Sequence, residues 1–451
     1  MNLRISTRAA GVAAAGAALA AAACSKDPVL VGTTAPSTAP FMARYVAVGN
    51  SITAGYQSGG INDSTQRRSY ARMLAIAAGA AFNYPSLNAP GCPAPIVNFL
   101  TGVRTTGDTA SACGFRAASS VTSALNDVAV PGANSFDAIG TGLTATATTS
   151  LTTGGYSILT SLFLGGQSQL QRAVQLDPTF ATVWIGNNDV LAGALQGAGD
   201  TTKATTVANF VSNYRTLVNG LVAGSPNLKG GVLISVIDVT NAPLLVPLYV
   251  FNPNVPGSSA AAYQAVLGVF GVGSTRPATF RVLFNANCTS SQASIAFSAL
   301  ATLAKTVPAS ATSFTFDCSG ASQVITGVAA TAQTNFLVTD VERTVYVNRV
   351  AAYNAYIKAK ADSLGWGYLD ANALLTQLKT SGAIPPFPNL AAPTAPFATA
   401  AGRYVTNDGV HPSTSAHYLI ANALITLINT KYGASLGANI RALTPADTSA
   451  L

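Results

Sequence analysis

The sequence predicts an α/β fold with a parallel central sheet, because short buried strands alternate along the chain with helix-like segments. Apolar runs bounded by Gly, Asn or Asp on at least one side occur at 45–48, 182–185, 232–237 and 367–369. Helix-like segments lie between them, at 67–80, 207–222 and 340–363. Because parallel sheets are covered on both faces, we expect helices on both sides of this sheet.

The individual elements follow from local patterns. The run at 45–48 ends at Gly49, as a buried strand does where it breaks into a turn. The segment at 67–80 is expected to be a helix packed behind that strand. The helix at 340–363 carries large apolar residues at helical spacing, Tyr346, Val350, Tyr353 and Ile357.

One region breaks the alternation. Residues 250–335 are rich in Gly, Ser, Thr, Ala and Phe and lack a strand–helix rhythm, so they are interpreted as an insertion in a domain at 41–435. The insertion is either a cap over the active site or a purely structural excursion. The tail at 436–451 follows the last helix and is expected to be loose.

The composition narrows the functional class. Charged residues make up 9% of the chain, against roughly 25% in typical globular domains, so Ser, Thr, Asn, Gln and Gly must build much of the surface. The formal net charge is +8, but no long Lys/Arg run occurs. The sequence therefore does not predict a nucleic-acid-binding protein.

The N-terminus resembles an export signal. Residues 1–23 contain Arg4, Arg8 and then an Ala-rich stretch that is shorter than the roughly 20 residues that span a bilayer. Small residues followed by Cys24 resemble a bacterial lipoprotein signal, and residues 24–40 form a Pro/Thr/Ser-rich tether. Ser25 follows the Cys, and in enteric bacteria the lack of Asp there would resemble outer-membrane sorting. We therefore expect an exported protein that is lipid-anchored at the outer membrane. An ordinary signal peptide with an incidental Cys is the alternative.

The other cysteines fall into two local sets. Cys92 and Cys113 form one set, and Cys288 and Cys318 form the other, which suits two disulfides in an oxidising compartment, although three pairings are possible. The chain has no C-x-x-C motif and no His near these cysteines, so metal ligation is disfavoured. We expect no metal or organic cofactor.

The chain contains only two histidines, His411 and His417. Histidine is the most frequent general base at neutral pH, so His-dependent catalysis must use one of them. Asp408, three residues before His411, lies in a Gly- and Pro-containing loop where its carboxylate could reach the imidazole. His417 falls in an apolar helix, where we expect it to cap the helix or face solvent.

Three further residues are candidates for the functional site. Two of them follow predicted strands, and the third lies in a Pro-Gly dipeptide. Ser51 comes directly after the first strand, and Asn188 follows the second, at the edge of a parallel sheet where ligands bind. Gly132, in a Pro-Gly dipeptide, could let a backbone N–H approach a substrate. Each has an ordinary alternative: serines at strand ends are usually turn residues or caps, and Pro-Gly usually marks a turn without a ligand.

Together these segments resemble the GDSL, or SGNH, hydrolase family. Its four signature blocks occur in family order, as Gly-Asn-Ser-Ile at 49–52, Ala-Val-Pro-Gly-Ala at 129–133, Gly-Asn-Asn-Asp at 186–189 and Asp-Gly-Val-His-Pro at 408–412. The resemblance spans residues 45–431 apart from the insertion. It implies a three-layer α/β/α, flavodoxin-like fold.

The resemblance also implies a role for each site residue. Ser51 would be the nucleophile, His411 the general base and then acid, and Asp408 the carboxylate that orients it. The oxyanion hole would comprise the backbone N–H groups of Ser51 and Gly132 and the side chain of Asn188. Gly91 is a less favoured alternative to Gly132. Asp189 is expected to be a structural hydrogen-bond acceptor, and Asn50, where the family has Asp, should alter only local hydrogen bonding.

The function implied by this resemblance is that of a serine ester hydrolase acting through an acyl-enzyme. Lipids, acetylated polysaccharides and small esters are all possible substrates. A non-catalytic surface-binding lipoprotein and an acyltransferase of the same fold are the alternatives.

Overall fold

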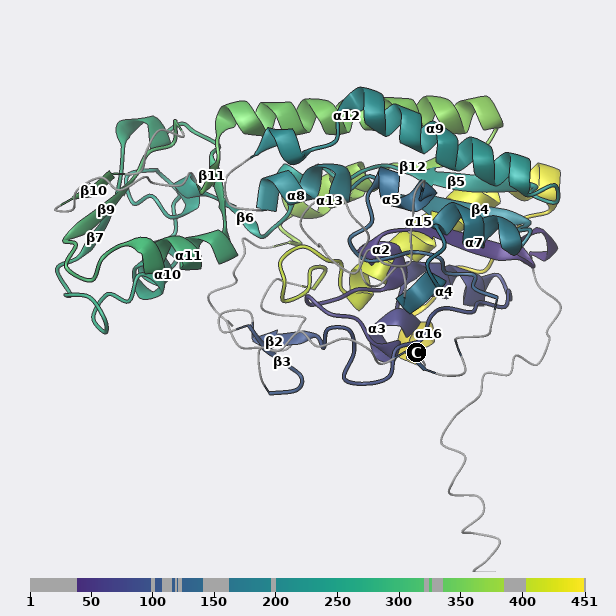
Figure 1. The fold of residues 1–451 in the computed structure, drawn as a ribbon, viewed down its shortest axis with the longest axis horizontal. Helices are drawn as coiled ribbons and strands as arrows, with labels where there is room; N and C mark the ends of the chain where they lie inside the picture. Colours follow the sequence, from purple (N-terminus) through teal and green to yellow (C-terminus); the bar gives the residue numbers. More distant parts are fainter. Residues whose placement is uncertain are drawn as a thin grey trace, which may run out of the picture.

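The computed structural model describes the chain in ten ranges (Figure 1), namely 39–98, 102–107, 116–117, 120, 124–140, 162–195, 200–319, 324–326, 336–384 and 403–449. The predicted signal at 1–23, Cys24, most of the tether and Cys113 lie outside these ranges. Their predicted roles therefore stay predictions.

A four-stranded parallel sheet forms the centre, with the order β1-β4-β5-β12. Its strands are β1 (Tyr45–Gly49), β4 (Phe180–Trp184), β5 (Gly230–Ile234) and β12 (Gly367–Leu369). Residues 126–130 run beside β1, because the Ala47 N–H donates to Asn126 and the Ala47 carbonyl accepts from Val128. The predicted α/β fold with a parallel sheet is confirmed.

Helices cover both faces of this sheet (Figure 1). Side chains alternate along β1, so that Val46 and Val48 join one buried cluster and Tyr45 and Ala47 join the other. The first cluster packs under α5 (Ser135–Ile139), α7 (Gln169–Gln175), α8 (Asn188–Leu195), α9 (Val207–Gly224) and α12 (Asp340–Leu364). The second packs under α4 (Tyr70–Ala77) and α15 (Thr414–Leu436). Both faces are thus apolar, as a parallel sheet requires.

Short elements connect these layers. They are η1 (Pro40–Met42), α2 (Ser51–Ala54), α3 (Asp63–Arg67), the hairpin strands β2 (Ile96–Asn98) and β3 (Val103–Arg104), η3 (Thr201–Lys203), η4 (Val239–Asn241), η5 (Leu248–Val250), α13 (Ala371–Thr380) and α16 (Pro445–Ser449).

The long helix α12 matches its prediction closely. It begins at a capping box in which Thr339 and Glu342 satisfy each other's backbone N–H groups, and it ends at Gly365 in the left-handed conformation. The predicted apolar side chains are all buried, namely Tyr346, Val350, Tyr353 and Ile357.

The described residues between 245 and 338 form a lobe beside the central sheet, at the left of Figure 1. One small sheet has the order β11-β8-β6, and the other has the order β10-β9-β7. The elements are β6 (Leu245–Pro247), α10 (Ala260–Val269), β7 (Arg281–Phe284), η6 (Ala286–Cys288), β8 (Ser294–Ala296), α11 (Phe297–Thr306), β9 (Ser313–Phe316), β10 (Val324–Thr326) and β11 (Leu337–Val338).

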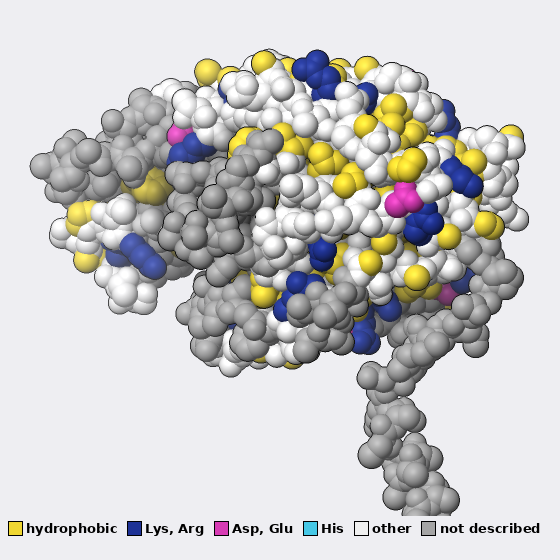
Figure 2. All heavy atoms as spheres, turned by 45° about the vertical axis from the view of Figure 1, so that its right-hand side comes forward, with side chains coloured by type: hydrophobic (Ala, Val, Ile, Leu, Met, Phe, Trp, Pro, Cys, Tyr) yellow, Lys and Arg dark blue, Asp and Glu magenta, His cyan; other side chains and the backbone are white. Residues whose placement is uncertain are grey.

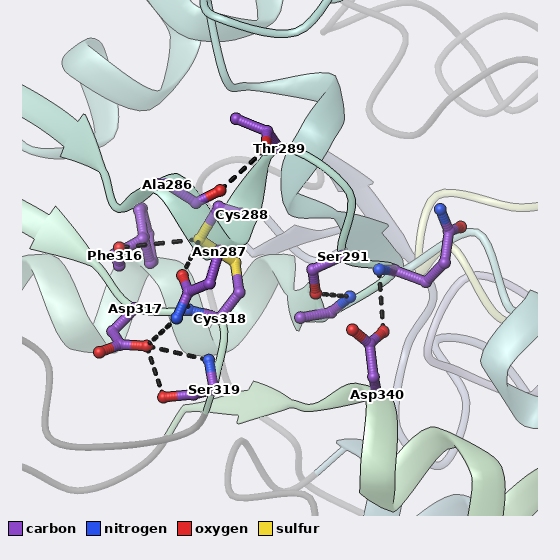
Figure 3. The surroundings of a disulfide bond; sticks show 12 residues. Ala286, Asn287, Cys288, Thr289, Ser291, Phe316, Asp317, Cys318, Ser319 and Asp340 are labelled. Carbon is purple, nitrogen blue, oxygen red and sulfur yellow. Dashed lines mark hydrogen bonds between the residues drawn. A yellow bond between two sulfur atoms is a disulfide. The ribbon is translucent and has the colours of Figure 1, made fainter.

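A disulfide between Cys288 and Cys318 joins two segments of the lobe (Figure 3). The side chain of Asn287 supports this link, because it donates to Asp317 and accepts from the Cys318 N–H. The predicted pairing of these two cysteines is confirmed. Cys92 is also disulfide-bonded.

The tail after α15 is not loose, contrary to prediction. Ile440 and Leu443 are buried against the core. The side-chain amide of Asn429 binds both the N–H and the C=O of Ile440, and Asn422 does the same for Leu443. Two asparagines on one face of α15 therefore hold this segment to the helix, and an apolar pattern alone does not reveal such polar clamps.

The surface is poor in charge, as the composition requires. On the face in Figure 2, charged side chains are sparse and scattered among uncharged polar side chains and backbone. Among the described residues, no helix is long and apolar enough to cross a membrane.

The segment beside β1 contains a buried carboxyl group whose ionisation is coupled to folding. Burial raises the pKa of Asp127 to about 8, although the carboxyl accepts a hydrogen bond from the Ala129 N–H. In an unfolded chain the pKa of Asp is about 4. The folded state therefore binds a proton more tightly between about pH 4 and pH 8, and the free energy of unfolding falls as pH rises through that window.

Replacing Asp127 by Asn should remove this dependence, because the amide oxygen can still accept from Ala129 but cannot ionise. We expect Asp127→Asn to show a flatter decline in the free energy of unfolding than the wild type between about pH 6.5 and pH 8. Asp137 and Asp189, whose pKa values are each raised to about 6, titrate mostly below this window. Chemical denaturation at several pH values measures the slopes, and equal slopes would contradict the assignment.

Candidate active site

Ser51 is the first residue of α2, directly after β1. The side chain of Asn50 accepts a hydrogen bond from the Ile52 N–H and caps the helix, which ends at Gly55 with φ +82°. A Cβ atom at Gly49 would lie 2.1 Å from Oγ1 of Thr53, so only glycine fits this tight strand-to-helix turn. The turn places Ser51 at the carboxyl end of β1, as predicted.

Asn50 stands where the GDSL signature block has Asp, and it still caps the N-terminus of α2. Its oxygen makes the capping bond that a carboxylate would also make, while its Nδ2 is buried without a partner among the described residues. Altered local hydrogen bonding relative to an Asp stays a prediction.

Ser51, His411 and Asp408 lie in a line of hydrogen bonds. Nε2 of His411 is 2.9 Å from Oγ of Ser51, and Nδ1 of His411 is 2.7 Å from Oδ2 of Asp408. The side chains of His411 and Asp408 are 14% and 12% exposed, so the line is largely shielded from water. Because an ionised Asp408 only accepts, Nδ1 carries the imidazole proton and Nε2 is left to accept from the serine.

Asp408 stays ionised in this setting. Burial alone would raise the pKa of its carboxyl, but the His411 charge and several hydrogen bonds hold that pKa well below its usual range. Oδ1 accepts from the backbone N–H groups of Val410 and His411 and from Oγ1 of Thr406, while Oδ2 also accepts from the Gly59 N–H. Charge-assisted bonds of this kind favour the carboxylate.

The loop that carries Asp408 and His411 is closed upon itself. The Thr406 N–H donates to the His411 carbonyl, and the Ser413 N–H donates to the Tyr404 carbonyl just before α15 begins. Gly409, with φ +69°, makes the reversal between Asp408 and His411. The ring of Tyr56 packs against the His411 imidazole, with 4.8 Å between ring centroids.

Two of the three predicted oxyanion donors, Gly132 and Asn188, lie at one turn. Residues 130–133 form this turn, in which the Ala133 N–H donates to the Val130 carbonyl and Gly132 has φ +84°. The Val130 N–H donates to Gly49, and Nδ2 of Asn188 donates to the Ala133 carbonyl at 2.9 Å. Among the described residues, neither the Ser51 N–H nor the Gly132 N–H has a hydrogen-bond partner.

The second N–H of the Asn188 amide has no partner among the described residues. This geometry joins the ends of β1 and β4 through one glycine turn, because the turn is bonded to both. Gly91, the alternative glycine, instead packs against the backbone of Ile61, where a Cβ atom would lie 2.3 Å from the carbonyl oxygen.

Asp189 is a structural acceptor, as predicted. Its carboxylate receives the N–H of Ser135 at 2.8 Å and the Ser135 hydroxyl at 2.6 Å. Burial raises the pKa of Asp189 to about 6, and these bonds limit the rise. The carboxylate thereby holds the start of α5, two residues after the glycine turn, to the residue that follows Asn188.

His417 neither caps α15 nor faces solvent, so that prediction is wrong. It is fully buried, and its Nδ1 accepts a hydrogen bond from the Tyr70 N–H at the start of α4. Burial lowers the pKa of His417 to about 3, which keeps the ring neutral. An apolar helix face does not reveal that a buried ring nitrogen will serve the N-terminus of a neighbouring helix.

A cavity of about 390 Å³ opens at Ser51 and His411. It is lined mainly by apolar side chains, which are Ile52, Trp184, Leu191, Ile237, Val239, Ala242, Pro243, Ala371, Leu374, Leu375, Leu378, Ile384, Val405, Val410, Pro412, Ala416, Leu419 and Ile420. The described residues that line it include no Asp, Glu, Lys or Arg. Asn188 is among them, and Gly132 is not.

The lobe forms no part of this lining among the described residues. It is nevertheless connected to the site, because the Leu244 N–H, just before β6, donates to the Gly409 carbonyl at 2.8 Å. No cluster of three or more His, Cys, Asp or Glu in the described part of the chain could hold a metal ion.

Comparison with known proteins identifies a family. No curated protein matches the chain. Among solved structures, a variant of an acetyl-xylooligosaccharide esterase and a catalytic mutant of an acetylxylan esterase, both from Geobacillus, are similar at 12% identity and a TM-score of 0.33, covering 85% of this chain and 93% of theirs. The model of the GDSL-like lipase/acylhydrolase family matches residues 45–424. The chain therefore belongs to the GDSL-like lipase/acylhydrolase family and is a hydrolase of ester bonds.

Proposed function

We propose that this protein is a serine esterase that works through an acyl-enzyme, with Ser51 as nucleophile, His411 as base and Asp408 as the orienting acid. The observation that carries the proposal is the hydrogen-bonded line from Ser51 through His411 to Asp408, with spacings of 2.9 and 2.7 Å. A serine hydroxyl is a weak nucleophile until an adjacent base takes its proton.

In the first half-reaction Oγ of Ser51 attacks the ester carbonyl carbon, and its proton moves to Nε2 of His411. The carbonyl oxygen becomes an oxyanion, which the N–H groups of Ser51, Gly132 and Asn188 would bind. The bond to the alcohol oxygen then breaks, and His411 returns the proton to the leaving alcohol. Asp408 stabilises the imidazolium throughout without taking up a proton.

In the second half-reaction a water molecule attacks the acyl-enzyme and gives one proton to His411. The tetrahedral intermediate collapses, the carboxylic acid leaves, and the proton returns to Oγ of Ser51. No electron transfer is involved, and the protons of both steps are handled by His411.

The cavity favours an ester with a hydrocarbon acyl chain over an acetylated sugar. A sugar needs many polar partners, whereas this lining is mainly apolar and, among the described residues, uncharged. Leu374, Leu375 and Leu378 lie on one face of α13, and each is only partly buried. A cavity of about 150 Å³ holds the six carbons of a benzene ring, so about 390 Å³ has room for roughly fifteen carbon-sized atoms. An acyl chain of roughly eight to twelve carbons would fill most of that volume and leave space for the ester group and part of the alcohol.

A chain-length series tests this function. We expect wild-type kcat/KM for p-nitrophenyl esters to rise from acetate by about fourfold for each methylene buried, up to roughly eight to twelve carbons. Ser51→Ala should show only background hydrolysis. Ser64→Ala, which removes an exposed hydroxyl on α3 that accepts from Arg68, is the matched control and should retain full activity.

Two results would count against the proposal. Equal hydrolysis by the wild type and Ser51→Ala would show that Ser51 is not the nucleophile. A maximum of kcat/KM at the acetate ester would agree with an esterase but contradict the preference for a long hydrocarbon acyl chain.

The proposed oxyanion donor Asn188 can be tested separately. We expect Asn188→Ala to lower kcat by about 10²- to 10³-fold with little change in KM, because the amide acts on charge that develops in the transition state. Asn219→Ala is the control, since the exposed Asn219 on α9 accepts only from Lys360 in the described structure. Steady-state kinetics decide the matter, and a rise in KM with kcat unchanged would assign Asn188 to ground-state binding.

A further inference from the structure

A tight turn at 57–60 supplies one of the hydrogen bonds to Asp408. The Gly59 N–H donates to Oδ2 at 2.5 Å, and this is the same oxygen that accepts from Nδ1 of His411 at 2.7 Å. The position of the Gly59 N–H therefore helps to fix Oδ2 of Asp408, the atom that orients the His411 imidazole. Gly59 lies outside the four signature blocks.

The turn holds an uncommon backbone. Ser58 and Gly59 have φ values of +55° and +64°, and Gln57 and Gly60 pair with each other across the turn. A non-glycine residue in the left-handed region persists only where its surroundings hold it there. Ser58 is fully buried, which agrees with a turn that is held from both sides.

On one side the turn is bonded to the loop of Asp408. The Ser58 N–H donates to Oγ1 of Thr406, and the Ser58 hydroxyl accepts from the Asn407 N–H. Thr406 in turn donates to Oδ1 of Asp408. The turn and the catalytic loop thus form one hydrogen-bonded unit.

On the other side the turn is bonded to the β2–β3 hairpin by Arg104 and Ile96. Nη1 of Arg104 donates to the Gly59 carbonyl at 2.8 Å and to the Ala94 carbonyl at 2.6 Å. The Ile96 N–H donates to the Ser58 carbonyl at 2.7 Å. Arg104 therefore holds the carbonyl side of the residue whose N–H binds Asp408.

The charge of Arg104 also reaches this region. Burial and the Asp408 charge raise the pKa of the Tyr56 hydroxyl, and the Arg104 charge opposes them. The ring of Tyr56 is the one that packs on His411. Arg104 does not line the cavity, so it has no contact through which it would bind substrate there.

We propose that Arg104 is a positioning residue for the catalytic pair, acting through Gly59 on Oδ2 of Asp408. This inference rests on the proposed roles of Asp408 and His411. Without the guanidinium, the carbonyl groups of Gly59 and Ala94 lose their donor, and Gly59 is less firmly held on its carbonyl side. Oδ2 then loses a well-placed partner, and the His411 ring loses part of its orientation toward Ser51.

The test compares Arg104→Met and Arg104→Lys with the wild type, using the p-nitrophenyl ester that the wild type hydrolyses best. We expect Arg104→Met to lower kcat by about tenfold or more with KM within about twofold, because small misplacements of catalytic groups are costly. Arg104→Lys keeps a charged donor and should recover part of the loss. Millimolar methylguanidinium should restore activity to Arg104→Met, and not to the wild type.

Arg276→Met is the matched control. Arg276 lies in the lobe, and its guanidinium also donates hydrogen bonds to backbone carbonyls, those of Phe270, Ala304, Val307 and Pro308. It lies over the ring of Phe280 as well. We expect this variant to lose stability while kcat per folded molecule is unchanged. The downfield proton resonance of His411 Nδ1–H, assigned by its loss in His411→Ala, should shift in Arg104→Met and not in Arg276→Met.

Some outcomes would overturn the inference. One is a kcat for Arg104→Met within twofold of the wild type, and another is a loss that disappears once the folded fraction is taken into account. If Arg104→Met does not fold, Arg104→Ala prepared with methylguanidinium decides, and a wild-type kcat that persists after methylguanidinium is removed would reject the role. Hydrolysis that requires Ser51 but is insensitive to Arg104 would reject this inference alone, whereas hydrolysis insensitive to Ser51 would reject the proposed function.

Discussion

Replacing His411 by Ala is expected to lower kcat by about 10⁵- to 10⁶-fold and to leave the fold intact. Nε2 of His411 lies 2.9 Å from Oγ of Ser51, and the chain has only one other histidine. Without this base the serine keeps its proton, and loss of a single member of such a triad costs nearly as much as loss of the whole triad. Steady-state kinetics and thermal unfolding of the purified variant measure both effects.

The second histidine, His417, is expected to affect stability and not catalysis. His417→Ala should destabilise the protein by about 2 to 4 kcal/mol, because it opens a cavity in the core and leaves the Tyr70 N–H without its acceptor. Its kcat per folded molecule should remain near that of the wild type. If His411→Ala keeps its activity, or if His417→Ala abolishes catalysis in folded protein, the assignment of the two histidines is reversed.

Replacing Asp408 by Asn is expected to lower kcat by about 10⁴-fold. Asn presents an amide N–H₂ in place of one carboxylate oxygen. Placed at Oδ2, that group would face the Gly59 N–H and Nδ1–H of His411, so donor would meet donor. The imidazole would then favour the tautomer that protonates Nε2, which cannot accept from Ser51. Kinetics at neutral pH, with circular dichroism to confirm folding, measure this effect.

The same substitution carries a signature in stability. The pKa of Asp408 is lower in the folded state than in an unfolded chain, where it is about 4, so the ionised carboxylate stabilises the fold above about pH 4. That contribution is lost as pH falls through the folded-state pKa. The difference in the free energy of unfolding between wild type and Asp408→Asn should therefore shrink below about pH 4. A difference that stays constant into the acid range would show that the carboxylate is not held ionised.

The central sheet could be predicted because its signals are local. An apolar run that ends at a turn predicts a buried strand from a few residues, and β12 occupies the predicted span of 367–369. Strand ends were less certain, since β5 begins at Gly230 and ends at Ile234, against a predicted 232–237. Hydrogen bonds to neighbouring strands set where a strand stops, and those partners are distant in the sequence.

Part of the candidate site could also be predicted from local patterns. Ser51 and Asn188 follow neighbouring strands of one parallel sheet, so their meeting at its carboxyl edge follows from the strand pattern. The contacts around Asp408 were not predictable. Gly59 and Arg104 are separated from the catalytic loop by about 300 residues or more, and each acts through a hydrogen bond that depends on how two loops pack.

The sequence by itself determined the parallel sheet and the residues at its carboxyl edge, because each depends on short-range patterns. It suggested the Cys288–Cys318 pair and left three pairings possible, and the structure selected that pair. Lipidation at Cys24 stays a prediction. Only the tertiary structure decided that His417 is a buried acceptor, that the tail at 437–449 packs on α15, and that the cavity is apolar. These features depend on which side chains from distant segments share a space, and burial and hydrogen-bond satisfaction are settled only when the whole chain has packed.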